Sequence, residues 1–542
     1  MNKKRNVAIV LLPLLIAVAM GCGIFLGRYM SNHALSPKEE KLRTVMKLIQ
    51  SDYVDVVDTD SLIEASFSDL LSMLDPHTIY IPAEELQDVN ADLMGSFSGI
   101  GVSFQIINDS VQVIEVVTGG PAEKVGILPG DRIIKADTTN LIGKDLNSEI
   151  VFKNLRGEKG STVELVIHRY GQKKDVKYDV VRGDIPVNSV DVVYMINDSI
   201  GYIKVTKFSR NTYMEFFNAL NDLKREGASS YVIDLRGNSG GFMDQAIFMA
   251  NEFLPAGRLI VYTKGRKHEN EYMAMSDGSG RFKDYPIVVL TNEGSASASE
   301  IFAGAIQDND RGLIIGRRTF GKGLVQNQTE LPDSSAIRMT VARYYTPSGR
   351  SIQKEYQRGD IKKYDMDIVD RYSHGEFYHA DSIKLNKEIV YHTANGREVY
   401  GGGGIMPDIF IPEDTTGFTS YYINVANQGL IQKYAYEVAD KYREALGGER
   451  NLAKLLNILP NDNVLLENFV VFAVENGVPA RWYYIGKSKD LLVNQLKAMI
   501  VRDVLGYSEF IELLNISDNT VNEALKRLEA GDSPVNIEVK QE

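Results

Sequence analysis

The sequence predicts a multidomain α/β protein, and three observations lead to that prediction. The chain has 542 residues, whereas single hydrophobic cores usually stop growing at about 250–300 residues. Between residues 185 and 353, apolar runs typical of buried strands alternate with helical patterns, as in a layered α/β domain. A segment rich in short strands precedes this region at residues 95–184, and helical segments flank both at residues 36–94 and 416–542.

Composition and charge exclude several function classes. Apolar residues make up 44% of the chain and charged residues 24%, which is ordinary for a globular protein. The net charge of −12 argues against a nucleic-acid partner, because such proteins normally present a basic face. A single cysteine, Cys22, excludes intrachain disulfides and Cys-cluster zinc sites, and the seven histidines form no HExxH pair. We therefore expect no metal and no cofactor.

Residues 1–35 are predicted to be a membrane anchor or a lipoprotein signal. Basic residues at positions 3–5 precede an apolar run over residues 7–26, and about 20 apolar residues can cross a bilayer as a helix. Basic residues before such a run favour a cytoplasmic N-terminus, which leaves the rest of the chain outside the cytoplasm. Residues 19–22 loosely resemble a lipobox without its usual leucine, but the apolar run continues past Cys22, so we favour an uncleaved anchor. Both alternatives tether the protein to a membrane.

Residues 36–94 have a helical pattern. Apolar residues recur at the i, i+3, i+4, i+7 spacing of one helix face at Leu42, Val45, Met46 and Ile49. The Asp-Pro-His sequence at residues 75–77 then breaks a second helix.

Residues 95–184 consist of β-rich runs separated by Gly/Pro turns, at residues 101–107, 111–117 and 163–168. Residues 121–134 predict a short helix that ends at Gly126, a turn at Pro129 and Gly130, and a strand. This string resembles the PDZ domain. The resemblance implies that the upstream loop binds a peptide's terminal carboxylate with backbone N–H groups, and the candidate residues are Gly99, Ile100, Gly101 and Val102.

The region at residues 185–353 contains apolar runs at 231–235 and 287–290, which predict buried strands leading into Gly- or Ser-rich turns and helices. Alternation of Ile337, Met339 and Val341 with polar residues predicts a half-exposed strand. The charged and aromatic segment at residues 354–399 lacks clear periodicity, and we interpret it as an insertion without an assigned role. Residues 400–415 return to the core through four glycines and an apolar strand at residues 409–411.

The last segment, residues 416–542, predicts a separate helical module of packing or assembly character. Two sets of apolar residues each share one helix face: Leu492, Leu496, Met499, Ile500 and Val504, and then Val521, Leu525 and Leu528. No candidate catalytic or ligand-binding residues are evident in this segment.

Ser297 is a candidate nucleophile. It lies between the strand at residues 287–290 and an apolar helix, and Ser297 with Glu300 fits a capping box, so helix capping alone explains it equally well. Small neighbouring residues leave room for a substrate backbone, and a helix N-terminus favours developing negative charge. Local chemistry does not distinguish Ser297 from Ser295 or Ser299.

Lys322 is the candidate base, because no histidine lies near these serines in sequence. Residues 316–322 imitate a P-loop, but Gly323 stands where that motif requires Ser or Thr to hold Mg²⁺, so an ATPase is not favoured. To act as a base, Lys322 needs a pKa lowered by burial. An exposed loop lysine is the alternative.

A glycine-rich turn at residues 234–241 follows the first buried strand. Glycine pairs in such a turn can direct backbone N–H groups at an oxyanion. A simple strand-to-helix turn is the other interpretation.

Together these segments resemble the carboxy-terminal processing peptidases, the tail-specific serine proteases. The resembling strings run in the family's order over roughly residues 36–415: the PDZ string and residues 234–241, 294–300, 319–326 and 345–351. In this family the nucleophile lies 25 positions before the lysine, and that spacing selects Ser297. The resemblance implies a crotonase-like α/β protease core with an inserted PDZ domain and flanking helical segments.

The resemblance also implies roles for other residues. Lys322 would be the general base, with Gln326, one helical-type turn later, as its orienting partner. The backbone of Ala298 and of either Gly240 or Gly241 would supply the oxyanion donors.

The implied function is that of a serine endopeptidase anchored in the inner membrane, with its catalytic bulk in the periplasm of a Gram-negative bacterium. It would cleave proteins or peptides near the C-terminus, and the PDZ domain would bind their free, apolar tails. The alternative is a non-catalytic, membrane-tethered PDZ adaptor. A homo-oligomer and an adaptor lipoprotein partner are left open.

Overall fold

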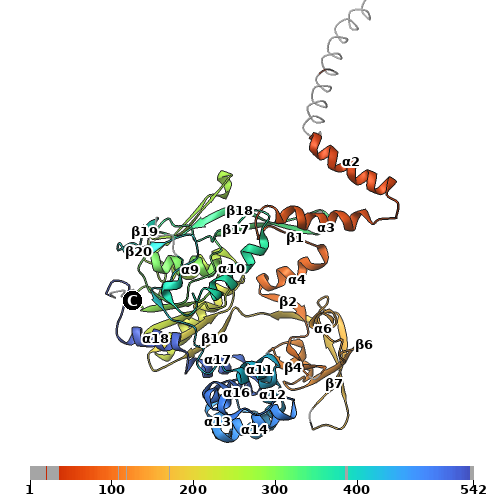
Figure 1. Ribbon diagram of the computed structural model, residues 1–542, viewed down its shortest axis with the longest axis vertical. Coiled ribbons are helices and arrows are strands. Elements are labelled where there is room, and N and C mark those ends of the chain that lie inside the picture. Colours follow the sequence, from red (N-terminus) through yellow and green to blue (C-terminus); the bar gives the residue numbers. More distant parts are fainter. Residues whose placement is uncertain are drawn as a thin grey trace, which may run out of the picture. The chain divides into compact units, whose positions relative to one another are not determined.

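The computed structural model describes Met20 and residues 36–536, apart from positions 108, 118, 170 and 385–388 (Figure 1). Contacts divide the chain into two compact units that separate between Met73 and Leu74. Within the described part of the chain, no helix is long and apolar enough to span a bilayer. The predicted anchor at residues 7–26 lies outside the described residues, apart from Met20.

The first unit contains the two helices expected there, α2 (Pro37–Asp52) and α3 (Thr59–Ser72). Ser36 caps α2 through a capping box with Glu39, and Asp58 caps α3. The predicted apolar face of α2 is not buried, since Leu42 and Val45 are both exposed.

The second unit begins with the Asp-Pro-His break and then departs from the helical prediction. Strand β1 (Ile79–Ile81) pairs antiparallel with β18 (Ala336–Tyr345) before the chain enters helix α4 (Ala83–Met94). A three-residue strand is too short to reveal a period in sequence, and its pairing partner lies more than 250 residues away.

The PDZ region forms an antiparallel sheet in the order β3-β4-β5-β7-β8, with β6 beside β5. Its elements are β3 (Val102–Ile107), β4 (Ser110–Val116), α5 (Pro121–Val125), β5 (Arg132–Ala136), β6 (Thr139–Asn140), α6 (Ser148–Leu155), β7 (Thr162–His168) and β8 (Val176–Val181). As predicted, α5 ends at Gly126, which has a φ of +89° that glycine tolerates. The two ends of the region lie side by side, because β2 (Ser96–Gly99) pairs with β9 (Gly183–Pro186).

A six-stranded sheet forms the centre of the protease core, in the order β10-β11-β12-β15-β16-β21. The strands are β10 (Val190–Met195), β11 (Ile200–Val205), β12 (Ser230–Asp234), β15 (Ile287–Thr291), β16 (Leu313–Gly316) and β21 (Ile409–Phe410). Only β10 and β11 pair antiparallel. Helices α7 (Thr212–Glu226), α8 (Met243–Asn251) and α9 (Ala298–Asp308) share a hydrophobic core with one face of the sheet.

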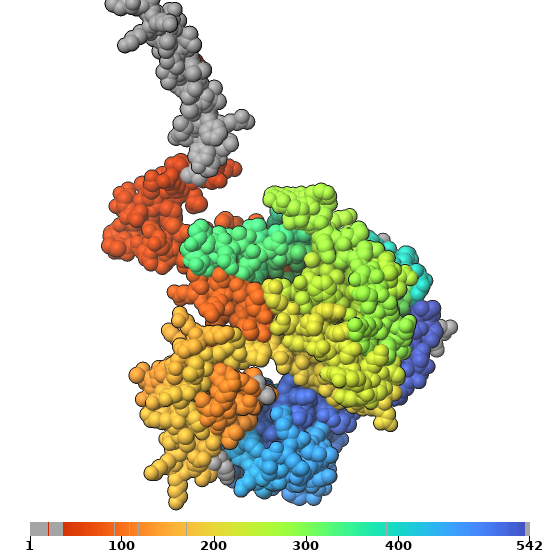
Figure 2. Space-filling model, turned by 180° about the vertical axis from the view of Figure 1, so that it is seen from behind, coloured from red at the N-terminus to blue at the C-terminus, as the bar shows by residue number. Residues whose placement is uncertain are grey.

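The end of the chain covers the other face of this sheet. Val521 of α18 (Asn519–Glu529) packs with Val232, Val288 and Leu313, and α17 (Tyr507–Asn515) contacts β10. Figure 2 shows this dark blue segment lying against the yellow and green core. Part of the region expected to be a separate helical module therefore belongs to the core.

The remaining C-terminal helices share a hydrophobic core of their own. They are α11 (Ser420–Asn427), α12 (Leu430–Leu446), α13 (Leu452–Ile458), α14 (Asp462–Glu475), α15 (Trp482–Lys487) and α16 (Lys489–Val504).

A second, antiparallel sheet carries the strand predicted around residue 339. Its order is β1-β18-β13-β14, with β17 (Leu324–Glu330) also paired to β18, β13 at Leu259–Gly265 and β14 at Tyr272–Met275. A 3-10 turn, η1 (His268–Asn270), links β13 to β14. The strand prediction is confirmed, but Met339 is exposed and the buried side chains are Ala336, Ala342 and Tyr344.

The segment at residues 354–399 contains regular structure that the sequence did not reveal. It holds α10 (Ile361–Ser373), η2 (Ala380–Ser382), β19 (Val390–His392) and β20 (Glu398–Tyr400). The buried residues of α10 are Tyr364 and Arg371. Because a buried arginine does not register as apolar, the helical period is hidden.

Candidate active site

Ser297 lies in the turn between β15 and α9, where it is the N-cap of the helix. Its backbone has φ +54° and ψ −112°, a conformation that costs a non-glycine residue free energy. The hydroxyls of the two neighbouring serines are occupied. Ser295 Oγ donates to the carbonyl of Leu235 (2.8 Å) and Ser299 Oγ donates to the carbonyl of Asn238 (2.9 Å), and both side chains are buried. Ser297 instead lines a cavity of about 660 Å³.

Glu300 joins the serine turn to the lysine loop. Its buried carboxylate accepts hydrogen bonds from the N–H groups of Ser297 (2.9 Å), Gly321 (2.7 Å) and Lys322 (2.8 Å) and from the hydroxyl of Thr319 (2.5 Å). Burial raises the pKa of Glu300, and these four donors oppose the rise. The capping-box pattern predicted the contact with Ser297, but nothing in the sequence indicated the contacts with residues 319–322.

Lys322 lines the same cavity as Ser297. Its ammonium donates to Gln326 Oε1 (3.1 Å), and among the described residues it makes no hydrogen bond to Ser297 Oγ. Burial lowers the pKa of Lys322, Arg338 lowers it further, and Glu300 and Asp75 act in the opposite direction. The buried Tyr344 hydroxyl lies between the two loops, near the carbonyl oxygens of Ser297 (3.1 Å) and Lys322 (2.5 Å).

Gln326 contacts Lys322 as expected, but through a different backbone geometry. The residue lies on strand β17 and not one helical turn beyond the lysine. Lys322 precedes the strand, which begins at Leu324, and its ammonium still reaches Gln326 Oε1. The Gln326 Nε2 group donates to the carbonyl oxygen of His77, a contact that the sequence did not suggest.

The glycine-rich turn after β12 packs directly against the serine. A Cβ at Gly240 would lie 2.6 Å from Ser297 Cβ, so only glycine fits there. The Gly240 N–H donates to Asn238 Oδ1 (2.9 Å). Among the described residues, the N–H groups of Ala298 and Gly241 have no hydrogen-bond partner. Of the two glycines left open by the sequence, Gly241 is therefore the one with an available donor.

A buried ion network lies beneath this turn. Asp234 is fully buried and accepts hydrogen bonds from the Tyr202 hydroxyl (2.6 Å), from Lys204 (3.4 Å) and from Arg236 (2.7 Å). Burial by itself would raise the pKa of Asp234, but the neighbouring Arg236 and Lys204 lower it overall. Arg236 also pairs with Asp518 (2.7 Å), which caps α18.

The cavity beside Ser297 is lined by apolar side chains and by several cations. The apolar set comprises Leu93, Met94, Phe208, Phe242, Met243, Ile301, Leu324 and Val325, and the cations are Lys207, Arg210, Lys322 and Arg338. A cavity of this character suits an extended peptide with apolar side chains. Within the described ranges, no group of three or more His, Cys, Asp or Glu side chains could hold a metal ion.

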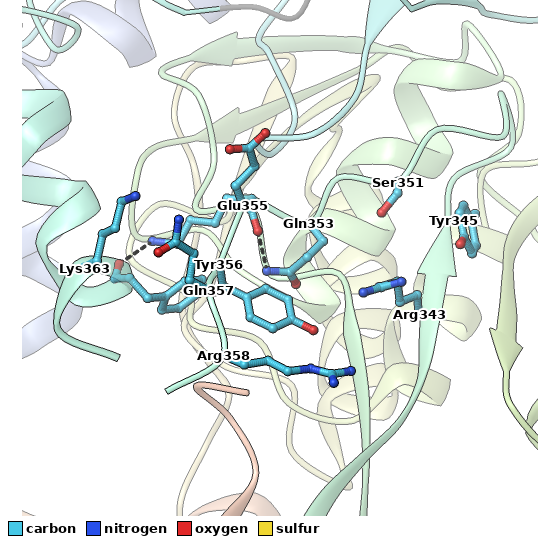
Figure 3. Close-up of a pocket in the computed structure, with 11 residues that line it drawn as sticks. Arg343, Tyr345, Ser351, Gln353, Glu355, Tyr356, Gln357, Arg358 and Lys363 are labelled. Atoms are coloured by element: carbon cyan, nitrogen blue, oxygen red, sulfur yellow. Dashed lines mark hydrogen bonds between the residues drawn. The ribbon is translucent and has the colours of Figure 1, made fainter. Parts of the chain in front are cut away.

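A second cavity of about 550 Å³ is formed largely by the segment that the sequence left unassigned. Figure 3 shows Tyr356 and Arg358 of this segment and Arg343 of β18 extending into it from different elements. Gln353 Nε2 donates to the carbonyl of Lys354 (2.9 Å), and Gln353 Oε1 accepts from the N–H of Gly323 (2.8 Å). The wall of this cavity therefore also supports the lysine loop.

The predicted carboxylate-binding loop lies between β2 and β3. Gly99 is paired with Gly183 at the end of β2, and Val102 begins β3. Ile100 is buried, and its carbonyl accepts from the N–H of Ala122 at the start of α5 (2.8 Å). Gly101 has a φ of +80°, which explains the need for glycine there.

Comparison with known families defines the class of protein. Peptidase family S41 matches residues 199–363, and the PDZ domain family matches residues 98–180. A family of unknown function matches residues 421–506, within the C-terminal helices. The protein is thus a serine endopeptidase with a PDZ domain.

Individual relatives make the assignment narrower. The chain is 39% identical over 375 residues to the carboxy-terminal-processing protease of Bartonella bacilliformis, covering 68% of this chain and 83% of that protein. It is 35% identical over 326 residues to the carboxy-terminal processing protease CtpA of Bacillus subtilis, and the match covers 60% of this chain and 69% of that protein. A solved photosystem II D1 C-terminal processing protease matches with 29% identity and a TM-score of 0.33, over 59% of this chain and 91% of that one. The chain belongs to the carboxy-terminal-processing protease family.

Proposed function

We propose that this endopeptidase uses Ser297 as its nucleophile and Lys322 as its general base. The observation that carries the proposal is that a serine with a strained backbone and a partly buried lysine line one cavity. Burial lowers the pKa of Lys322, which increases the neutral fraction that can accept a proton.

The chemistry is acyl transfer. Neutral Lys322 takes the proton of Ser297 as Oγ attacks the substrate carbonyl carbon, and the unpaired N–H groups of Ala298 and Gly241 bind the oxyanion. When the tetrahedral intermediate collapses, the peptide C–N bond breaks and the lysine ammonium protonates the leaving amine. Lys322 then accepts a proton from water, which attacks the acyl-enzyme and releases Ser297. Gln326 orients Lys322 throughout, because its Oε1 can accept an N–H hydrogen bond from the Lys322 nitrogen in either protonation state.

Substrates are proteins or peptides, and we propose that their free, apolar C-terminal tails bind the PDZ loop at residues 99–102. PDZ-type recognition adds the tail as an extra strand and binds its carboxylate with backbone N–H groups. The apolar lining of the catalytic cavity supports cleavage of an unstructured, apolar segment.

We also propose that the enzyme is tethered to the inner membrane with its catalytic part in the periplasm. Support comes from the basic residues at positions 3–5 and the apolar run at residues 7–26. Protease added to spheroplasts should degrade the enzyme without lysis. Degradation only after lysis would contradict this location.

The dyad is tested by comparing cleavage of a disordered substrate by wild type, Ser297→Ala and Lys322→Ala. Each variant should lose on the order of 10³-fold or more in kcat. The exposed Ser229→Ala and Lys267→Ala variants serve as matched controls and should cleave at the wild-type rate. Full activity of Ser297→Ala or Lys322→Ala would contradict the dyad. A wild-type protein that binds free C-termini but never cleaves would instead support the adaptor function.

A further inference from the structure

The Asp-Pro-His break at residues 75–77, which the sequence singled out only as the end of a helix, lies against Gln326, the partner of Lys322. The carbonyl oxygen of His77 accepts the hydrogen bond from Gln326 Nε2, and Gln326 Oε1 accepts from Lys322 Nζ (3.1 Å). His77, Gln326 and Lys322 therefore form one chain of hydrogen bonds, although His77 lies 249 positions before Gln326 in the sequence.

Asp75 holds this segment in a closed turn. Its Oδ1 accepts from the N–H groups of His77 (2.9 Å) and Thr78 (3.0 Å), and its Oδ2 accepts from the Thr78 hydroxyl (2.6 Å). Such an Asx turn fixes the backbone of the residues that follow the aspartate. The direction of the His77 carbonyl is thus set by the carboxylate of Asp75.

Strand β18 fixes the same turn to the second sheet. Thr340 Oγ1 donates to Asp75 Oδ1 (3.0 Å), and the Thr340 N–H donates to Thr78 Oγ1 (3.1 Å). Asp75 and Thr78 are both buried, so the loss of any of these partners would leave unpaired polar groups. The turn is therefore a rigid part of the site.

The imidazole of His77 packs on α10. Its Nε2 lies 2.9 Å from the Tyr364 hydroxyl, and the two rings meet edge to face with centroids 5.2 Å apart. Burial and the nearby Lys322 lower the pKa of His77 to about 4, so the ring is neutral at ordinary pH.

The His77 carbonyl decides which end of the Gln326 amide faces the lysine. A carbonyl oxygen can only accept, so it selects the NH₂ end of the amide. The amide oxygen must then face Lys322 Nζ. Without the carbonyl, the amide could turn its NH₂ group toward the lysine, which would remove the acceptor that orients the general base.

We propose that Asp75 and His77 are positioning residues of the active site, which act on Lys322 through Gln326. This inference rests on the proposed roles of Lys322 and Gln326. Neither residue is among those that line the cavity beside Ser297.

A double-mutant cycle tests the route through Gln326 in the full-length enzyme. Asp75→Ala should lower kcat at least tenfold on a fluorogenic peptide while KM changes less than threefold. In a Gln326→Ala background, Asp75→Ala should add less than a twofold loss, because the connection is already broken. If the fold-loss of kcat in the double variant equals the product of the losses in the two single variants, the inference is overturned while the proposed function stays intact. An unimpaired Gln326→Ala would overturn both the orienting role of Gln326 and this inference.

Asp333→Ala is the matched control. Asp333 closes a similar turn at the tip of the β17–β18 hairpin, where its Oδ1 accepts from the N–H (3.1 Å) and hydroxyl (2.6 Å) of Ser335. This variant should keep wild-type kcat. An equal loss of kcat in Asp333→Ala would overturn the inference, because the effect would then be general to the hairpin.

Asp75→Asn keeps the turn but removes the charge, and it remains informative if Asp75→Ala fails to fold. The charged groups that act on Lys322 are Arg338 of β18, Glu300 of α9 and Asp75 itself, and Asp75 favours the ammonium form. Asp75→Asn should therefore recover at least half of the wild-type plateau rate and shift the acid limb of kcat/KM to lower pH. A plateau as low as that of Asp75→Ala would overturn the inference.

Discussion

At the scale of single residues, Gly240 is a tightly constrained neighbour of Ser297, the proposed nucleophile. Its φ is +102°, and an added Cβ would also lie 2.8 Å from the Ala296 carbonyl oxygen and 3.0 Å from Ala298 N. Because backbone atoms cannot move aside easily, Gly240→Ala should displace the serine turn and lower kcat on the order of 100-fold. Steady-state cleavage of a fluorogenic peptide, with circular dichroism to verify folding, measures the effect.

Gly237→Ala is the control in the same turn. Gly237 also has a positive φ, +74°, but no atom lies within 4 Å of the added Cβ. The Gly237→Ala enzyme should therefore lose only about 1 kcal/mol of its free energy of unfolding and retain most of its activity. Equal losses of activity in both variants would show that φ strain, and not contact with Ser297, accounts for the effect.

Arg338 offers a test of how the pKa of Lys322 is lowered. The guanidinium disfavours the charged lysine, so Arg338→Gln should raise the lysine pKa and decrease its neutral fraction at a given pH. In the proposed mechanism the neutral lysine is the active form, so the acid limb of kcat/KM should move to higher pH by up to about one unit. The control is Arg343→Gln on the same strand, whose profile should match wild type. A shift of the Arg338→Gln limb to lower pH would contradict the assignment of Lys322 as base.

At the residue scale, the sequence could nominate candidates but not separate them. The spacing to Lys322 selected Ser297 through a family resemblance, and the buried bonds of Ser295 and Ser299 now give a physical reason for that choice. The choice between Gly240 and Gly241 depends on where the Asn238 side chain points, which no local pattern encodes.

Among the secondary-structure elements, α18 shows how the end of the chain supports the core. Val521 is fully buried against the central sheet, so Val521→Ala should destabilise the core by about 2 kcal/mol through lost burial and a small cavity. Hydrogen–deuterium exchange of β12, β15 and β16 should become faster. Val535→Ala removes the same atoms from an exposed side chain and should leave both the stability and the exchange rates of these strands unchanged. Unchanged exchange in Val521→Ala would mean that α18 is dispensable for the sheet.

Elements with a clear period were predictable, and the others were not. Strands β12 and β15 were found from their apolar runs, because a fully buried strand leaves a local signature. Strand β1 and helix α10 were missed. One is three residues long, and the other buries Arg371, which is paired with Glu376 (2.8 Å).

At the scale of the whole molecule, the PDZ domain lies between two strands that pair with each other, β2 and β9, so we expect that it can be removed. Gly99 and Gly183 face each other in the β2–β9 pair, so an Asn-Gly hairpin turn could join them in place of residues 100–182. The shortened enzyme should cleave a small ester with kcat within about twofold of wild type, but it should lose the proposed preference for free over amidated C-termini. The preference is measured as the ratio of kcat/KM for a peptide with a free C-terminus to kcat/KM for the same peptide with an amidated C-terminus. A retained preference would place tail recognition outside the PDZ domain.

The sequence by itself determined the class of protein, the order of its domains and the two residues at the centre of the proposed chemistry. These depend on short strings of glycine, serine and lysine whose spacing is local. Only the tertiary structure decided that Glu300 joins the serine turn to the lysine loop, that α18 packs on the central sheet and that the His77 carbonyl accepts a hydrogen bond from Gln326. Each of these depends on hydrogen bonds or packing between segments far apart in the chain, and such pairings leave no periodic trace in a single sequence.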